Sequence, residues 1–272
     1  MLLRSIEMKR SGGLPDGFPF DVPAVQSFTG IELNASVTFF VGENGSGKST
    51  LLEAIACAVG SITVGSESVE TDQTLADIRR LADTLRLSWT RKTRAGFFMR
   101  AEDFFGYTKQ IARLRHEMEE DLGRVERDYR GRSKMAKSLA RMPYAREIGE
   151  LKRTYGRGLD ANSHGEGFLK LFQARFVGEG LYLIDEPEAP LSPTRQMSLL
   201  TLIKMMVDKG GQFIIATHSP IILAYPGASI LSFDGGMIAP VEYRELDHFQ
   251  VTRDFLNNPE AFLRVLLADE DK

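Results

Sequence analysis

The feature that most constrains the fold is a glycine-rich stretch between an apolar run and a helical pattern. Residues 37–41 are apolar and β-branched, as a buried strand requires, and residues 51–59 place apolar side chains at helical spacing. Between them, Gly42 to Ser49 has Gly at its first and sixth positions, followed by Lys and Ser. The backbone N–H groups of such a loop surround phosphate oxygens, and the positive end of the next helix faces the same anion. The pattern therefore predicts a phosphate-binding loop that joins a strand to a helix.

The residue types in this loop specify a ligand and a chemistry. Lys48 is predicted to reach the β- and γ-phosphates of ATP and to act in catalysis, and the Ser49 hydroxyl is predicted to bind Mg²⁺. A glycine-rich turn with an incidental lysine is the alternative, and the flanking strand and helix argue against it. We expect the nucleotide to be bound by Gly42, Asn44, Gly45, Ser46, Gly47, Lys48, Ser49 and Thr50.

A second apolar run ends in two adjacent carboxylates. Residues 181–184 are a buried-strand pattern, and Asp185 and Glu186 follow directly. In open α/β sheets the ligand binds at the carboxyl ends of the strands, so charge is expected at this place. We predict that Asp185 holds Mg²⁺, directly or through water, and that Glu186 orients or deprotonates the attacking water. A solvated surface end of a strand is the alternative.

A single histidine follows a third apolar run. Residues 213–216 read as a strand, and His218 comes two residues later. A lone histidine is usually structural. At the end of a strand next to the phosphate loop, however, it is placed to sense the γ-phosphate, and we predict a catalytic role for His218.

Strand patterns alternate with helical patterns along the chain, which predicts an α/β fold with a mostly parallel central sheet and flanking helices. We expect a single domain over residues 1–272 that contains a helical insertion at residues 103–160. The insertion is charged and helix-favouring, and its breaks predict two or three helical pieces a few tens of ångströms long at most, which excludes long coiled-coil arms. The expected breaks are Gly123, Gly131, Pro143 and Gly149.

The charge of the chain is unevenly distributed. Residues 74–158 hold 21 Lys and Arg against 12 Asp and Glu, although the whole chain has a formal net charge of −3. This basic middle fits either a solvated helical face or a surface for an anionic partner, duplex DNA first. Cys57 is the only cysteine, and no run approaches the roughly 20 apolar residues of a membrane helix. We therefore expect a cytoplasmic protein with no membrane segment.

These motifs and their order resemble the ABC-type ATPases, especially the soluble RecF-like and SMC-like P-loop branch. Residues 163–167 are similar to the signature motif of that family, and their Gly-Glu ending is closer to the SMC-like version than to the Gly-Gln of transporters. The resemblance implies that Ser163 and Gly165 cap the nucleotide held by a partner subunit, so that two chains form an ATP-dependent homodimer. Residues 189–192 stand in the place of the D-loop, which crosses the dimer interface in the family, and His218 matches the switch histidine.

The chain also departs from the family pattern. At the place of the Q-loop glutamine it has Arg100, with Glu102 two residues later, and either residue is a candidate replacement. The family's adenine-stacking aromatic precedes the phosphate loop, and we expect it to be Phe20, with Phe18 or a core role for both as alternatives.

The predicted function is that of a Mg²⁺-dependent ATPase that works as a switch. Its output is DNA maintenance or repair, or sensing in a multi-protein system with a separately encoded effector protein, such as a nuclease in a defence system. The ATPase subunit of a membrane transporter is the alternative, and it would be expected to have the Q-loop glutamine and the Gly-Gln ending. A nucleotide-binding scaffold without turnover is disfavoured by the intact Asp185-Glu186 pair.

Overall fold

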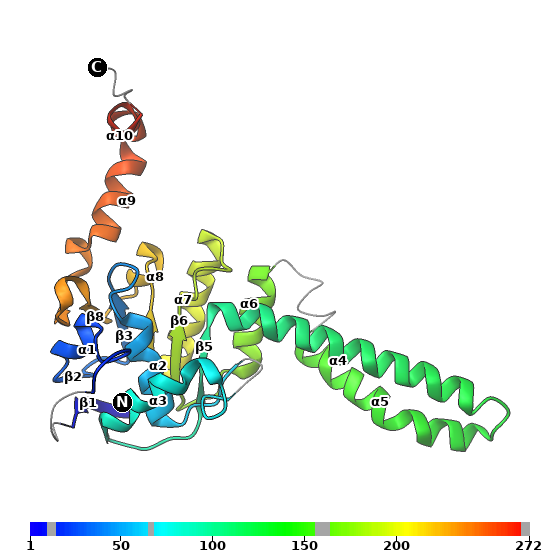
Figure 1. Ribbon diagram of the computed structural model, residues 1–272. Coiled ribbons are helices and arrows are strands. Elements are labelled where there is room, and N and C mark those ends of the chain that lie inside the picture. The colour runs from blue at the N-terminus through cyan, green and yellow to red at the C-terminus, as the bar shows by residue number, and fades with distance from the viewer. Residues whose placement is uncertain (10–14, 65–67, 156–163, 268–272) are drawn as a thin grey trace.

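The computed structural model describes residues 1–9, 15–64, 68–155 and 164–267. Its centre is a six-stranded sheet with the strand order β5-β6-β7-β3-β8-β9 (Figure 1). All neighbouring strands are parallel except β8 and β9, which are antiparallel at one edge. The predicted α/β fold with a mostly parallel sheet is confirmed. The strands are β3 (Val37–Val41), β5 (Gly96–Arg100), β6 (Leu181–Asp185), β7 (Gln212–Ala216), β8 (Ser229–Ser232) and β9 (Ala239–Pro240).

The central strands are buried on both faces. Every residue of β3, β6 and β7 is buried, which explains why these segments read as continuous apolar runs rather than as alternating patterns. Alternate side chains enter different cores, as Phe40 packs into one hydrophobic cluster and Phe39 into the other. The sheet is therefore a central layer between two apolar cores.

The first core lies between the central sheet, two helices, the short helix at residues 23–27 and a second, antiparallel sheet with the order β2-β1-β4. The second core lies under the start of the helix that follows β5 and under three helices that come later in the sequence. The elements of the first core are β1 (Leu3–Met8), β2 (Gly30–Glu32), α2 (Lys48–Val59), α3 (Ala76–Thr84) and β4 (Leu85–Trp89). The three later helices of the second are α6 (His164–Arg175), α7 (Pro193–Asp208) and α8 (Pro220–Leu223).

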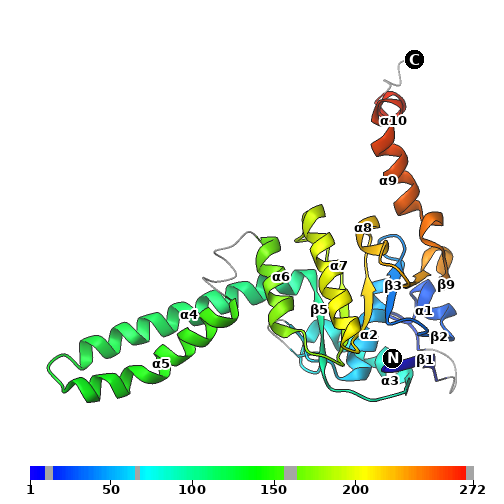
Figure 2. The same cartoon turned by 180° about the vertical axis from the view of Figure 1, so that it is seen from behind.

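Two helices form an antiparallel hairpin that projects from the body of the protein (Figures 1 and 2). They are α4 (Ala101–Asp128) and α5 (Lys134–Tyr155), which agrees with the expectation of two or three pieces. The break at Gly131, whose φ is +89°, lies between them as expected.

The other three predicted breaks are wrong. Helix α4 continues through Gly123, and α5 continues through Pro143 and Gly149. A glycine costs a helix about 1 kcal/mol and an interior proline about 3 kcal/mol. The packing of α4 along α5 offsets these local costs, because most helix stability in proteins comes from tertiary contacts.

The remaining elements are helices, most of them toward the two ends of the chain. The C-terminal helices α9 (Asp247–Asn257) and α10 (Pro259–Leu266) extend away from the body, on a different side from the hairpin (Figures 1 and 2). No helix among the described residues has both the length and the apolar character needed to cross a bilayer. The other short helices are α1 (Pro23–Ser27), η1 (Gln73–Leu75), η2 (Asp234–Gly236) and η3 (Tyr243–Glu245).

A buried glutamine connects the two sheets. The side-chain oxygen of Gln212 accepts hydrogen bonds from the backbone N–H groups of Leu2 (2.9 Å) and Leu3 (2.8 Å). Its amide nitrogen donates to the Leu3 carbonyl at 2.8 Å. The start of β7 thereby satisfies backbone groups at the start of β1 that would otherwise be buried without partners.

We predict that Gln212→Leu lowers the free energy of unfolding by about 3 kcal/mol, because it leaves the Leu2 and Leu3 backbone groups without partners. Urea denaturation followed by circular dichroism measures the change. Gln110→Leu on the exposed surface of α4 is the control, with an expected change below about 0.5 kcal/mol. Equal losses in the two variants would contradict this role of Gln212.

Candidate functional site

The loop from Gly42 to Gly47 connects β3 to α2, as the sequence predicts, and its shape requires glycine. The φ of Gly47 is +99°, and a Cβ atom there would lie 2.7 Å from Cγ1 of Val22. Gly47 is the N-cap of α2, so the backbone N–H groups of the first helical turn begin directly after it. Asn44 and Gly45 are exposed at the tip of the loop.

The loop surrounds the ammonium group of its own lysine. Lys48 is 4% exposed, and its Nζ donates hydrogen bonds to the carbonyl oxygens of Gly42 (2.7 Å) and Glu43 (2.8 Å). Burial lowers the pKa of Lys48, while the nearby carboxylates of Glu186 and Asp185 act in the opposite direction. Both partners are neutral carbonyl oxygens, so phosphate oxygens could take their place while the lysine stays protonated.

A carboxylate that the sequence analysis missed also holds the loop. The Glu43 backbone N–H donates to Oδ1 of Asp234 at 2.8 Å, and Ser232 Oγ is 3.0 Å from Asp234 Oδ2. Asp234 follows β8, which neighbours β3 in the sheet. Its position after an apolar strand is the same signal that identified Asp185, so the sequence contained the information needed to find it.

The predicted metal ligands lie next to each other. Ser49 Oγ, in the first turn of α2, is 3.2 Å from Oδ1 of Asp185 at the end of β6. A hydroxyl and a carboxylate are the hard oxygen donors that Mg²⁺ takes, so this pair fits the ion. Burial raises the pKa of Asp185 to about 7, and the hydrogen bond from Ser49 opposes the shift. The charge of Lys48 also opposes the shift, but among the described residues no cation forms an ion pair with Asp185.

Glu186 and His218 are brought together at the ends of β6 and β7. Glu186 has a φ of +49°, which is rare for a residue with a side chain, and its backbone N–H bonds the Ala216 carbonyl at 2.9 Å. Its side chain is 45% exposed, and Oε1 lies 3.6 Å from Nε2 of His218. Such conformations are concentrated at functional sites, because the surrounding structure must hold them.

His218 is held by two further contacts, one to its backbone and one to its ring. The His218 backbone N–H donates to Oε1 of Glu188 at 2.6 Å, and Nδ1 of its ring is 3.0 Å from Nε2 of His248. Burial lowers the pKa of His218, and the charge of Lys48 acts in the same direction. The sequence analysis missed Glu188 and His248, and His248 has no motif around it that could have indicated it.

The segment at residues 189–192 is linked to the histidine segment through one side chain. Gln196 of α7 donates from Nε2 to the Leu191 carbonyl at 3.1 Å. Its Oε1 accepts from Ser219 Oγ at 2.5 Å, and the same Ser219 oxygen caps α8. The positions of these two loops are therefore mechanically connected.

The prediction for Phe20 is wrong. Its ring is 2% exposed and packs into the first hydrophobic core, so neither face is available to an adenine base. Of the two candidates, Phe18 is the exposed one. The signature residue Ser163 lies outside the described residues, and Gly165 lies in the first turn of α6, where only its backbone is described.

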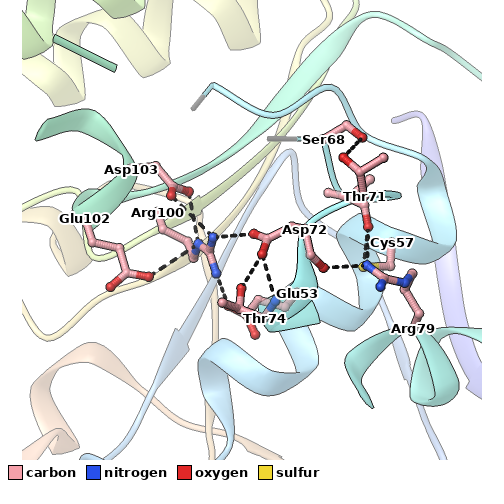
Figure 3. A network of polar contacts seen from close by, with 11 residues as sticks. Glu53, Cys57, Ser68, Thr71, Asp72, Thr74, Arg79, Arg100, Glu102 and Asp103 are labelled. Carbon is pink, nitrogen blue, oxygen red and sulfur yellow. Dashed lines mark hydrogen bonds and ion pairs between the residues drawn. The ribbon is translucent and has the colours of Figure 1, made fainter. Parts of the chain in front are cut away.

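Arg100 ends β5 and occupies the register position beside Asp185. Its side chain is 13% exposed and forms ion pairs with Asp72 (2.9 Å), Asp103 (3.0 Å) and Glu53 (3.3 Å), as Figure 3 shows. A guanidinium has no lone pair to give a metal, so Arg100 cannot replace a glutamine as a ligand. Here it neutralises carboxylates instead.

The second candidate for the Q-loop position is placed differently. Glu102 has a side chain that is 76% exposed, and it reaches Arg100 Nε only at 3.5 Å (Figure 3).

Burial raises the pKa of Glu53, with Arg100 opposing the shift. The cluster thus joins α2, β5 and the first turn of α4 through one cation.

We predict that Arg100→Met lowers the free energy of unfolding at pH 7 by about 3 to 5 kcal/mol, because it leaves carboxylates buried without their cation. Arg100 lowers the pKa of the buried Glu53, so its removal raises that pKa further. As the pH falls, the folded variant then takes up a proton at a higher pH than the folded wild type does. The deficit should therefore shrink as the pH is lowered toward about 5.

Denaturant titrations at several pH values measure this deficit. Arg80→Met, which removes an exposed pair with Asp77, is the control and should cost less than about 1 kcal/mol at any pH. A loss in Arg100→Met that does not depend on pH would contradict the electrostatic account.

A phosphate loop, a strand-end acid pair and a histidine on neighbouring parallel strands form the arrangement that the sequence analysis expected of a P-loop ATPase. The profile of one protein family, described as "AAA domain, putative AbiEii toxin, Type IV TA system", matches residues 70–224, more than half of the chain. The chain belongs to this family of AAA domains. Membership of this family agrees with the expected recognition as a P-loop ATPase and with the expectation of ATP binding and hydrolysis.

Solved structures of two classes are similar to the chain. One is cbiO1 from Clostridium perfringens, part of an ABC transporter complex, with 17% identity, coverage of 96% of this chain and 98% of that one, and a TM-score of 0.47. Another is the Smc head domain with an extended coiled coil from Pyrococcus furiosus, with 13% identity, coverage of 95% and 99%, and a TM-score of 0.44. A third is the SMC head domain from Thermotoga maritima, with 18% identity, coverage of 89% and 100%, and a TM-score of 0.40. The comparison with curated proteins gives no significant match.

Proposed function

We propose that this ATPase is a switch in which two copies of the chain close around two ATP molecules in the presence of Mg²⁺. The observation that supports the proposal most is the convergence of Lys48, the Ser49–Asp185 pair and the Glu186–His218 pair at one edge of the sheet. Each is a group that phosphoryl transfer to water needs, and together they cover charge neutralisation, metal binding and activation of the nucleophile.

Each residue has a stated role in this proposal. Lys48 exchanges the carbonyl oxygens of Gly42 and Glu43 for oxygens of the β- and γ-phosphates. Ser49 and Asp185 hold Mg²⁺, which neutralises charge on the phosphates when it is bound. Glu186 orients the attacking water and accepts its proton, and His218 donates a hydrogen bond toward the γ-phosphate.

The homodimer supplies what one chain lacks in this proposal. Glu186 is half-exposed, so its face of the site is open to a second surface. The first turn of α6, with Gly165, presents backbone N–H groups that suit the γ-phosphate of the partner's nucleotide. ATP binding then closes the dimer and hydrolysis opens it. A cytoplasmic location fits ATP as the substrate.

We predict that Glu186→Gln lowers kcat for ATP hydrolysis at least about 100-fold, because an amide cannot accept the proton of the attacking water. The variant should still bind ATP and should accumulate as a dimer. Multi-angle light scattering with and without ATP and Mg²⁺ measures the mass.

Glu147→Gln on the exposed face of α5 is the control for Glu186→Gln and should hydrolyse ATP at the wild-type rate. A Glu186→Gln protein that stays monomeric at saturating ATP and Mg²⁺ would contradict the sandwich. A variant with wild-type kcat would contradict the role of Glu186 itself.

Duplex DNA is the partner that we propose for the closed state. The far end of the hairpin presents Arg127, Arg130 and Arg132, which are all exposed. Some basic residues of the middle segment already have partners, since Arg91 pairs with Glu179 at 3.0 Å and Arg124 with Asp121 at 3.3 Å. The hairpin end is therefore the better candidate for phosphate contacts than the turn at residues 91–94.

We predict that changing Arg127, Arg130 and Arg132 together to Glu weakens duplex binding and makes the salt slope of log K shallower by about 2 to 3, because up to three phosphate contacts are lost. Changing Arg91, Lys92 and Arg94 to Glu should have a smaller effect. Fluorescence anisotropy of a labelled duplex over a range of salt concentrations measures both.

A second triple variant, with the same change in net charge at another place on the surface, is the control for the DNA-binding experiment. Changing Arg244, Arg253 and Arg264 to Glu alters the exposed C-terminal segment and should leave duplex binding within about twofold of the wild type. If the wild-type protein binds no duplex at low salt with ATP and Mg²⁺ present, the DNA proposal is wrong.

The description of the family favours a second candidate output. It mentions a toxin and a type IV TA system, which fits a sensor ATPase that acts with a separately encoded effector protein. ATP turnover that is insensitive to DNA but changes when such a protein is added would support it. The transporter subunit remains the alternative class, and the ion-paired Arg100 at the Q-loop position is an argument against it.

A further inference from the structure

A second histidine contacts the catalytic pair from outside every motif discussed above. His248 lies in the first turn of α9, and its Nε2 is 3.0 Å from Nδ1 of His218. The two ring centroids are 5.2 Å apart, with an interplanar angle of 46°. This is a direct hydrogen bond between two imidazoles, which requires one proton between the two nitrogens.

The position of His248 is fixed by the residues around it. Leu246, just before α9, is buried in the second core, and Phe249 packs on Tyr243 with a centroid distance of 4.6 Å. The hydroxyl of Tyr243 donates to the Pro220 carbonyl at 2.9 Å, close to the histidine segment. The start of α9 is therefore held against the segment that contains His218, and the imidazole contact is built into the fold.

The shared proton has two alternative locations, and they have opposite consequences. If His248 donates, Nδ1 of His218 accepts, and the proton of the neutral His218 ring is on Nε2. If His218 donates from Nδ1, its Nε2 has a lone pair. Among the described residues Nε2 has no hydrogen-bond partner, and Oε1 of Glu186 lies 3.6 Å from it.

The surrounding charges select the first location. The groups that act on His218 are Lys48 from α2, Asp234 from η2, Glu186 and Glu188 after β6, and His248 from α9. Glu186 faces Nε2, and a γ-phosphate would add further negative charge on that side. A lone pair directed at these anions is repelled, whereas an N–H donor is attracted.

We propose that His248 is a positioning residue for ATP hydrolysis, which donates from Nε2 to Nδ1 of His218 and thereby keeps the His218 proton on Nε2, directed at Glu186 and the γ-phosphate. The proposal rests on the role given above to Glu186 and His218. It adds a residue of α9 to the catalytic site. Hydrogen-bond partners of metal-bound histidines orient those rings in the same way.

Steady-state ATP hydrolysis by His248 variants tests the proposal. His248→Ala should lower kcat about 10- to 100-fold with KM for ATP changed less than about twofold, because proton placement matters after ATP is bound. His248→Gln should restore kcat to within about fivefold of the wild type, because its amide nitrogen can donate at a similar reach. His248→Leu, which has no donor, should be as slow as His248→Ala.

Two controls separate positioning from structure. His116→Ala, on the exposed surface of α4, should leave kcat unchanged. In a His218→Ala background, His248→Ala should change kcat less than about twofold, because the residue through which it acts is already gone. A loss of kcat in that background as large as in the wild type would overturn the proposal, and so would wild-type kcat in His248→Ala.

The tautomer can be read directly by nitrogen NMR of the protein labelled with ¹⁵N-histidine. The chain has four histidines, and the His218→Ala spectrum assigns the signals of His218. The expected spectrum shows a protonated Nε2 and an unprotonated Nδ1 in the wild type. The reverse assignment would overturn the proposal. Full activity of His218→Ala would instead refute the role of His218, and with it the proposed mechanism.

Discussion

The candidate site depends on the parallel register of the central sheet. One row of paired positions crosses five strands and contains Arg100, Asp185, Ala216, Phe40 and Leu231. Parallel strands in register end at the same edge, so the residues that follow this row are forced together. The loop at residues 42–49, the acid pair and the segment that contains His218 all begin within two residues of the row. Desolvation at this edge then sets the pKa shifts of the buried lysine and aspartate.

The residues at this edge could be predicted from the sequence where a local pattern indicated them. The loop and the acid pair could be predicted because each follows a recognisable apolar strand. Asp234 obeys the same rule and was overlooked. His248 could not be found, since its contact with His218 depends on how α9 packs. Phe20 was misassigned because an aromatic residue before a phosphate loop looks the same whether it faces a base or the core.

Arg100 illustrates a limit of comparing motifs by position. The sequence indicated only that a glutamine was missing at the end of β5. In the structure, the arginine at this position forms ion pairs with the carboxylates of Glu53, Asp72 and Asp103. Burial would lower the pKa of this guanidinium, but its hydrogen bonds and the surrounding carboxylates outweigh burial and raise it. The hairpin shows a similar limit of local patterns. Gly123 and Pro143 predicted breaks, but the packing of the two helices keeps both residues within helices.

The hairpin has a consequence for motion that follows from where it starts. Helix α4 begins at the residue after Arg100, with no loop between strand and helix. Its 28 residues span about 42 Å at roughly 1.5 Å per residue. A rigid rod of that length turns a rotation of about 5° at its base into a displacement of about 4 Å at its free end. A small rotation of α4 near the cluster around Arg100, beside the candidate site, would therefore produce a larger displacement at the far end of the hairpin.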